Sequence, residues 1–290
     1  MSEWTRPRHL PEALEILAAA PGQYRVISGG TDLMVESHLA PERRPDSWLD
    51  ISGLRELQGL QITEEGIRIG AATSLEVVRR HAEVAVHWPM LAASAAVTGA
   101  PPIQNRATLG GNICNASPAA DNAPVLLAYG ARLEIVHHHG TRWLPYADFH
   151  QGYRKTALQA GELLGAVWIP YPPPHSRGYF RKVGTRAAQA IAKVGIAALI
   201  EEDREGVIQR ARFGMASVAA VPCALPSVSR YLEGRAVRDV AEAPVRQGVR
   251  QDIAPVKDIR STAAYRLEIA SRLVLEAIDP RAARKKEDGV

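Results

Sequence analysis

Cysteine is almost missing from this sequence, whose 290 residues include only Cys114 and Cys223. Two thiols cannot form a disulfide framework, a four-thiolate zinc site or an iron–sulfur cluster on their own. We therefore expect a protein of a reducing compartment whose fold depends on a buried core. Cys114, which closely follows a pair of glycines, is expected to be a small packed residue without a redox role.

Long apolar runs and a large excess of one charge are missing as well. The closest candidate for a membrane span, residues 194–200, is too short and has charged residues on both sides. Residues 1–7 lack the apolar core of a secretion signal. The formal net charge is +4, and no basic face interleaved with aromatic residues is present, as nucleic-acid binding would require. These absences predict a cytoplasmic protein that binds neither a membrane nor nucleic acid.

Aromatic residues are also scarce, at 6% of the chain, so the core must consist mostly of Ala, Leu, Val and Ile. Hydrophobic residues make up 46%, which is ordinary for a globular protein. A chain of 290 residues has room for two domains. The proline-rich stretch at residues 170–174 stiffens the chain. We therefore expect one domain over residues 1–174 and another over residues 175–290.

Local patterns predict both helices and strands along the chain. Residues 24–27 have the pattern of a buried strand, and residues 31–39 that of a helix ending before Pro41. Residues 60–71 are expected to form a hairpin. Residues 98–121 show no clear periodicity and are expected to be one long loop, which is usually functional. Beyond the proline-rich stretch we expect a strand over 178–183, a helix over 189–201, a hairpin over 207–218, and helices near 225–232 and 262–278.

Two glycine pairs flanked by small polar residues are the most informative feature present. They are Ser28-Gly29-Gly30-Thr31-Asp32 and Thr108-Leu109-Gly110-Gly111-Asn112. Glycine allows sharp turns and brings backbone amides close to a ligand, and clustered amides before a helix attract anions. Two such loops predict a pyrophosphate gripped from two sides, and hence a dinucleotide. For the first loop alone, a strand-to-helix turn capped by Thr31 or Asp32 remains an alternative.

The second pair lies within a segment, residues 101–121, that concentrates hydroxyls, amides and one carboxylate. Such groups recognise a ligand with phosphates and sugar hydroxyls, and Asp121 could accept from a ribose or ribityl hydroxyl. Neither the G-x-G-x-x-G fingerprint nor a Walker sequence is present, which disfavours a Rossmann or P-loop fold.

Three consecutive histidines, His137, His138 and His139, precede Gly140. Because successive strand residues point to opposite faces, three adjacent imidazoles are not expected to converge. We expect a hairpin tip here and no metal site.

Several of these segments together resemble the flavin-binding subunit of the molybdenum hydroxylases, a family that includes the flavoproteins of xanthine dehydrogenase and carbon monoxide dehydrogenase. The resemblance covers nearly the whole chain in order. It rests on the two glycine pairs, on Ala116-Ser117-Pro118 with Asp121, on Gly161-Glu162-Leu163-Leu164, on Arg181-Lys182-Val183-Gly184, and on Ser261-Thr262-Ala263-Ala264-Tyr265-Arg266.

The resemblance implies an FAD-binding domain of the vanillyl-alcohol-oxidase type, followed by a smaller α+β domain. It implies that residues 28–32 and 108–112 hold the pyrophosphate and ribityl chain of FAD. Ser117 and Asp121 match positions that bind its hydroxyls and phosphates, and Leu164 matches an apolar residue near the isoalloxazine. Lys182 matches a lysine beside the ring, where a cation would stabilise the negative charge of the reduced flavin.

The function implied is electron transfer without a catalytic residue of its own. A [2Fe–2S] small subunit would pass electrons from a molybdopterin-containing large subunit to FAD, and NAD⁺ or another acceptor would receive them. A dimer of heterotrimers is the implied assembly. Two alternatives remain: a self-sufficient FAD-dependent oxidoreductase of the same fold, and a nucleotide-binding module without redox chemistry.

Overall fold

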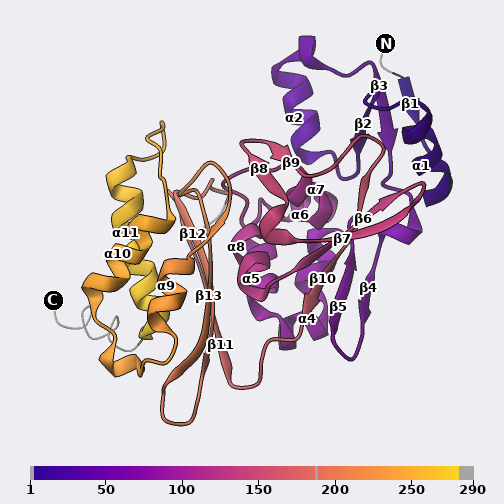
Figure 1. The fold of residues 1–290 in the computed structure, drawn as a ribbon. Helices are drawn as coiled ribbons and strands as arrows, with labels where there is room; N and C mark the ends of the chain where they lie inside the picture. Colours follow the sequence, from indigo (N-terminus) through magenta and orange to yellow (C-terminus); the bar gives the residue numbers. More distant parts are fainter. Residues whose placement is uncertain (1–2, 187–188, 281–290) are drawn as a thin grey trace.

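The computed structural model describes residues 3–186 and 189–280, which form a mixed α+β fold (Figure 1). Its strands form a three-stranded, a five-stranded and a four-stranded sheet and one small two-stranded ribbon. This confirms the expected fold class. No helix within the described ranges is long and apolar enough to cross a membrane.

The N-terminal part is a small parallel sheet with two helices. Strands β1 (Glu3–Thr5), β3 (Ser47–Asp50) and β2 (Tyr24–Ile27) lie in that order. Helix α1 (Leu10–Ala19) forms because its apolar positions recur on one face, and Ala13, Leu14 and Leu17 are buried. Helix α2 (Thr31–Leu39) follows β2 through the first glycine pair, as predicted, and buries none of its residues.

The central part is an antiparallel five-stranded sheet in the order β4-β5-β10-β6-β7. The predicted hairpin over residues 60–71 is confirmed by the pairing of β4 with β5. The bounds are β4 Leu60–Ile62, β5 Gly66–Gly70, β6 Arg132–His137, β7 Gly140–Pro145 and β10 Leu163–Pro170, with helices α3 Leu75–Arg80, α4 Ala82–His87, α5 Pro89–Val97, α6 Pro101–Arg106, α7 Leu109–Cys114 and α8 Ala123–Tyr129. The short strands β8 (His150–Gly152) and β9 (Lys155–Thr156) pair with each other.

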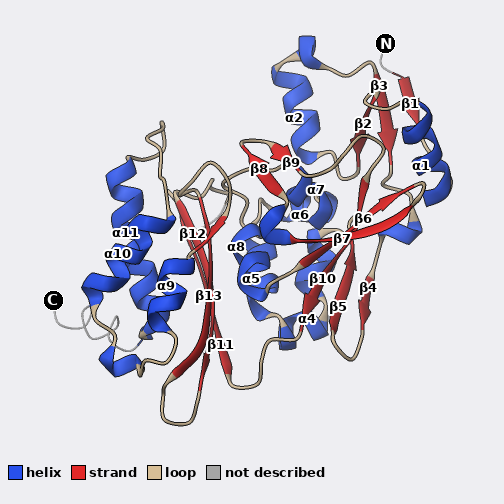
Figure 2. Ribbon diagram, viewed as in Figure 1, coloured by secondary structure: helices blue, strands red, loops and turns tan. Residues whose placement is uncertain are grey.

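The C-terminal part is an antiparallel sheet in the order β11-β12-β13-β14. Its bounds are β11 Ser176–Val183, β12 Val194–Glu202, β13 Ile208–Ala216 and β14 Cys223–Ala224, with helices α9 Pro226–Leu232, α10 Glu242–Asp252 and α11 Ala263–Ile278. These three helices cover one face of the sheet, whereas α5 and α8 lie between it and the five-stranded sheet (Figure 2). A Cβ on Gly214 of β13 would collide with the carbonyl oxygen of Pro124 in α8, which explains the glycine there.

Two sequence predictions for the C-terminal part are wrong, as is the prediction of one long loop over residues 98–121. A helix was expected over residues 189–201, but most of this range belongs to strand β12. This strand lies between β11 and β13, and both of its faces are buried, so its sequence is a continuous apolar run. The hairpin expected over 207–218 is a single strand, β13, that pairs with β12. The loop expected over 98–121 contains the short helices α6 and α7.

Candidate functional site

The first glycine loop joins β2 to α2 and exposes a row of unused backbone donors. Gly30 has a left-handed φ of 73° and is the N-cap residue of α2. In the described part of the chain, the amides of residues 29–32 donate to no protein acceptor. The hydroxyl oxygen of Ser28 is buried and also lacks a hydrogen-bond partner there. A helix N-terminus adds partial positive charge, so the loop is suited to an anion.

The alternative explanation of this loop as a capped turn does not hold. Among the described residues, no side chain caps α2, so neither Thr31 nor Asp32 has that role. Desolvation, followed by repulsion from Glu36, raises the pKa of Asp32, and Arg154 partly offsets the effect. The Asp32 carboxylate would repel a phosphate at close range, so the groups of the loop that could accommodate an anion are its amides and Ser28.

The first glycine pair packs against the chain just before the second, although almost eighty positions separate the two pairs in the sequence. A Cβ on Gly29 would overlap the carbonyl oxygen of Arg106, which stands just before the second loop. A Cβ on Gly110 would lie 2.5 Å from the carbonyl oxygen of Ala71. Both glycines are therefore required by close backbone approach, and Gly29 packs directly against the chain that leads into Thr108.

The second loop offers fewer free backbone amides than the sequence suggested, because those of residues 109–112 bond within the protein. Thr108 caps α7, and its hydroxyl accepts from the Gly111 amide at 3.0 Å. The amide of Gly110 donates to Ala71 at 2.9 Å. The amide of Leu109 donates to the Thr73 carbonyl at 3.0 Å and that of Asn112 to the Thr108 carbonyl at 3.0 Å, whereas that of Thr108 donates to no acceptor among the described residues. The donors left for a ligand are therefore the Thr108 amide and the side chains of Thr108 and Asn112.

A buried asparagine that sequence reasoning missed orients the second loop. Asn122 is fully buried, and its amide nitrogen donates to Asn112 Oδ1 at 3.2 Å. The same nitrogen donates to Thr98 Oγ1 at 3.3 Å, and Asn122 Oδ1 accepts from Ser94 at 2.8 Å. Because Asn112 Oδ1 is engaged, its amide nitrogen faces the other way. Nothing in the local sequence pattern marks this network.

Asp121 and Lys182, both predicted from the resemblance, form an ion pair between the central and C-terminal parts. Lys182 Nζ on β11 lies 2.6 Å from Asp121 Oδ2 and donates to the Val97 carbonyl at 3.0 Å. Their side chains are 11% and 10% exposed. Burial raises the pKa of Asp121 to about 6, although Lys182 lowers it. Within the described residues, Asp121 Oδ1 is buried without a partner and could accept a ligand hydroxyl.

Ser117 has a hydroxyl hydrogen available to a ligand, whereas Leu164 is buried in the core. The Ser117 hydroxyl accepts from the Ala119 amide at 3.2 Å and keeps its hydrogen for another acceptor. The preceding residue, Ala116, has a strained φ of 49°, a feature that clusters at binding sites. Leu164 is 4% exposed in the core, opposite Ile135 of β6, so it offers little surface to a flavin. Its contact with the ring stays a prediction.

Two further expectations concern cysteine and histidine. Cys114 is exposed at the end of α7, so the expectation of a packed residue is wrong.

The hairpin tip at Gly140 is confirmed by the pairing of β6 with β7. The argument that the three imidazoles cannot converge is wrong, because one nitrogen of each lies within 4.8 Å of the others. Strand alternation fails here because His138 and His139 form the turn itself.

These residues fit the chemistry of a flavin dinucleotide. Free amides and the unpartnered Ser28 hydroxyl suit phosphate oxygens, and the unpartnered Asp121 Oδ1 suits a ribityl or ribose hydroxyl.

Comparison with known proteins supports the same assignment along the whole chain. The family described as "FAD binding domain in molybdopterin dehydrogenase" matches residues 1–172, and "CO dehydrogenase flavoprotein C-terminal domain" matches residues 179–280. The putative xanthine dehydrogenase FAD-binding subunit XdhB of Escherichia coli K12 is 31% identical over 280 residues, which cover 96% of this chain and 94% of the relative.

Two carbon monoxide dehydrogenase chains extend the comparison. The medium chain of the Afipia carboxidovorans enzyme is 27% identical over 290 residues, covering 98% of each chain. A chain in a crystal structure of the cyanide-inactivated Cu,Mo-CO dehydrogenase superposes with a TM-score of 0.89 at 25% identity, again covering 98% of each chain.

Proposed function

Because this chain belongs to the FAD-binding subunits of the molybdenum hydroxylase family, the group of the xanthine and carbon monoxide dehydrogenases, we propose that it is an electron-transfer subunit. Its cofactor is FAD, and it is part of an oxidoreductase. FAD supplies the ability to exchange electrons one or two at a time. The protein would take electrons from a [2Fe–2S] subunit and release them to NAD⁺ or another acceptor.

The observation that carries this proposal is the row of unused donors in the first glycine loop. The amides of Gly29, Gly30 and Thr31, with the Ser28 hydroxyl, would bind the pyrophosphate at the N-terminus of α2. The second loop would add its Thr108 and Asn112 side chains. The second loop would contribute mainly side chains, because the amides of residues 109–112 already bond within the protein.

Asp121, Ser117 and Lys182 would hold the flavin half of the cofactor. Asp121 Oδ1 and the Ser117 hydroxyl would bind hydroxyl groups of the ribityl chain. Lys182 uses two of its three N–H groups within the described structure, on Asp121 and on the Val97 carbonyl. Its third N–H would face the ring and favour negative charge on the reduced form. Leu164 would contribute only as apolar support near the ring.

Partners and organisation complete the proposal. Relatives are named as medium chains or FAD-binding subunits, which supports a large molybdenum subunit and a small [2Fe–2S] subunit as partners. We place the FAD-binding domain at residues 1–174 and the second domain at 175–290, with the Asp121–Lys182 pair joining them. A dimer of heterotrimers and a cytoplasmic location complete the assignment, the latter supported by two free cysteines.

Spectroscopy and activity of the purified chain test this function. The chain should carry FAD that bleaches with dithionite, and it should not oxidise xanthine, carbon monoxide or other hydroxylase substrates alone. Adding a reduced [2Fe–2S] subunit from the same operon should bleach the flavin. Substrate turnover by the isolated chain would instead support a self-sufficient oxidoreductase. Bound FAD that resists reduction would support a nucleotide-binding module without redox chemistry.

A further inference from the structure

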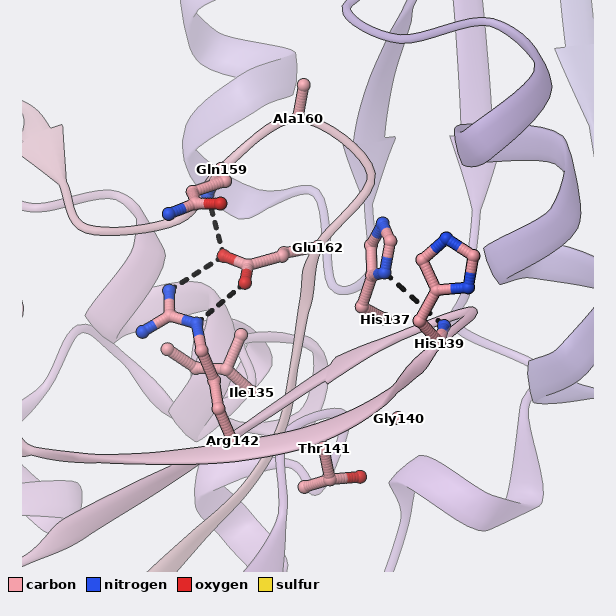
Figure 3. Close-up of a pocket in the computed structure, with 9 residues that line it drawn as sticks. All are labelled: Ile135, His137, His139, Gly140, Thr141, Arg142, Gln159, Ala160 and Glu162. Carbon is pink, nitrogen blue, oxygen red and sulfur yellow. Dashed lines mark hydrogen bonds and ion pairs between the residues drawn. The ribbon is translucent and has the colours of Figure 1, made fainter.

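The apex of the β6–β7 hairpin gathers three imidazoles on one short turn. His137 ends β6 and pairs with Gly140 at the start of β7, so His138 and His139 form a two-residue turn. Gly140 has a φ of 142°, which closes the turn. Successive side chains of a strand point to opposite faces of the sheet, but His138 and His139 lie in the turn, so this rule does not keep their rings apart. The rings of His137 and His139 stand side by side at the apex (Figure 3).

The spacing of the ring nitrogens suits a single transition-metal ion. His138 Nδ1 lies 3.0 Å from His137 Nε2, and one nitrogen from each ring lies within 4.8 Å of the others. Tetrahedral zinc with bonds of 2.0–2.1 Å sets its nitrogen ligands about 3.3 Å apart. The His137–His138 pair therefore already has nearly the required separation. His139 is exposed, so rotation of its side chain can supply the remaining adjustment of about 1.5 Å.

Two of the ring nitrogens are close enough to share a proton, which a metal ion can replace. The 3.0 Å contact between His138 and His137 places one proton between two ring nitrogens. Coordination through His137 Nε2 would move the ring proton to Nδ1. The hydrogen bond of 3.3 Å that the His139 amide donates to Nδ1 would then be lost.

The surroundings anchor one ligand and leave a coordination position open. His137 is half-buried, with Nε2 against Gly161, where an added Cβ would lie 3.0 Å away. The nearby carboxylate of Glu162 is held by Arg142 at 2.6 and 2.7 Å, so it does not serve as a fourth ligand (Figure 3). An open pocket of about 280 Å³, lined in part by His137 and His139, borders the apex and can admit water or a small ligand.

We propose that His137, His138 and His139 bind one divalent transition-metal ion of the zinc class, with its fourth position open to this pocket. Imidazole suits zinc, copper and nickel, whereas magnesium and calcium prefer oxygen ligands. The proposal does not rest on the proposed function, because none of the three histidines is assigned to FAD.

Calorimetric titration of the full FAD-loaded chain with zinc chloride tests the site. The expected result is saturable binding of about one zinc ion per chain, with no binding of magnesium under the same conditions. The double variant His138→Ala/His139→Ala should weaken zinc binding at least about tenfold, a change of one decade in Kd. Both side chains are exposed, so the variant should keep its FAD content and thermal unfolding midpoint.

A matched control uses a histidine outside the cluster. His38 is exposed on α2, and His38→Ala should bind zinc like the unaltered chain. Zinc should also raise the unfolding midpoint of the chain and of His38→Ala, but not that of the double variant. Unsaturable zinc binding, or equal binding by the double variant and the unaltered chain, would overturn the proposal.

Discussion

Lys182 Nζ on β11 lies 2.6 Å from Asp121 Oδ2, immediately before α8, and both side chains are about nine-tenths buried. The pair connects the C-terminal sheet to the segment that carries the second glycine pair. Its other carboxylate oxygen, Oδ1, is buried without a protein partner in the described structure. One contact therefore joins the two parts of the molecule and presents an acceptor to the proposed flavin site.

Lys182→Met should destabilise the chain, because it leaves a buried carboxylate without its cation. The expected loss is up to about 3 kcal/mol in the free energy of unfolding, since removing one partner of a buried pair is costly. The double variant Asp121→Asn/Lys182→Met should recover most of that loss. Urea unfolding of the three proteins measures the coupling, and equal losses in the single and double variants would contradict it.

Asp121 should also give the stability a distinctive pH dependence. Its folded pKa is raised to about 6, whereas the carboxyl of an unfolded chain titrates near its ordinary value of 3.8. Between these values the folded chain holds a proton that the unfolded chain has lost, so this contribution to stability declines as pH rises toward 6. In unfolding experiments from pH 4.5 to 7.5, Asp121→Asn should lack the decline. A difference between the two proteins that does not change with pH would refute this assignment.

Thr108 should stabilise the second loop through its hydroxyl alone. Thr108→Ala removes the acceptor for the Gly111 amide and should cost about 1 kcal/mol of unfolding free energy. Thr108→Ser keeps the acceptor and serves as the control, with stability close to that of the unaltered chain. Thermal unfolding distinguishes the two, and similar destabilisation by both variants would show that the methyl group matters instead.

Sequence patterns predicted the parts of the site that are local. The strand over residues 24–27, the turn at Gly29–Gly30 and the helix over residues 31–39 follow from residue types and short-range order. Asp121 and Lys182 were each assigned to the cofactor, but their ion pair was not predicted, because no local rule connects residues on separate elements. The contact of Gly29 with Arg106 likewise requires the assembled fold.

The failures have identifiable physical causes. The run that forms β12 is apolar on both faces, and a fully buried strand lacks the alternation that distinguishes it from a helix. The amides of Leu109 and Gly110 were counted as free because their acceptors, Thr73 and Ala71, lie on a distant segment. At His138 and His139 the strand rule was applied to turn residues, which it does not govern.

The FAD affinity of Gly29→Ala, measured by fluorescence titration of the FAD-free chain, tests the central claim most directly. An added Cβ would force the first loop away from Arg106, whereas Gly53→Ala meets no atom within 4 Å and serves as the control. Ser28→Ala, which removes one buried donor without a clash, should weaken binding by about 1 kcal/mol. We predict that Gly53→Ala binds FAD normally and that folded Gly29→Ala binds it at least about tenfold more weakly. Unchanged affinity in both Gly29→Ala and Ser28→Ala would contradict the proposal that the first loop holds the FAD pyrophosphate.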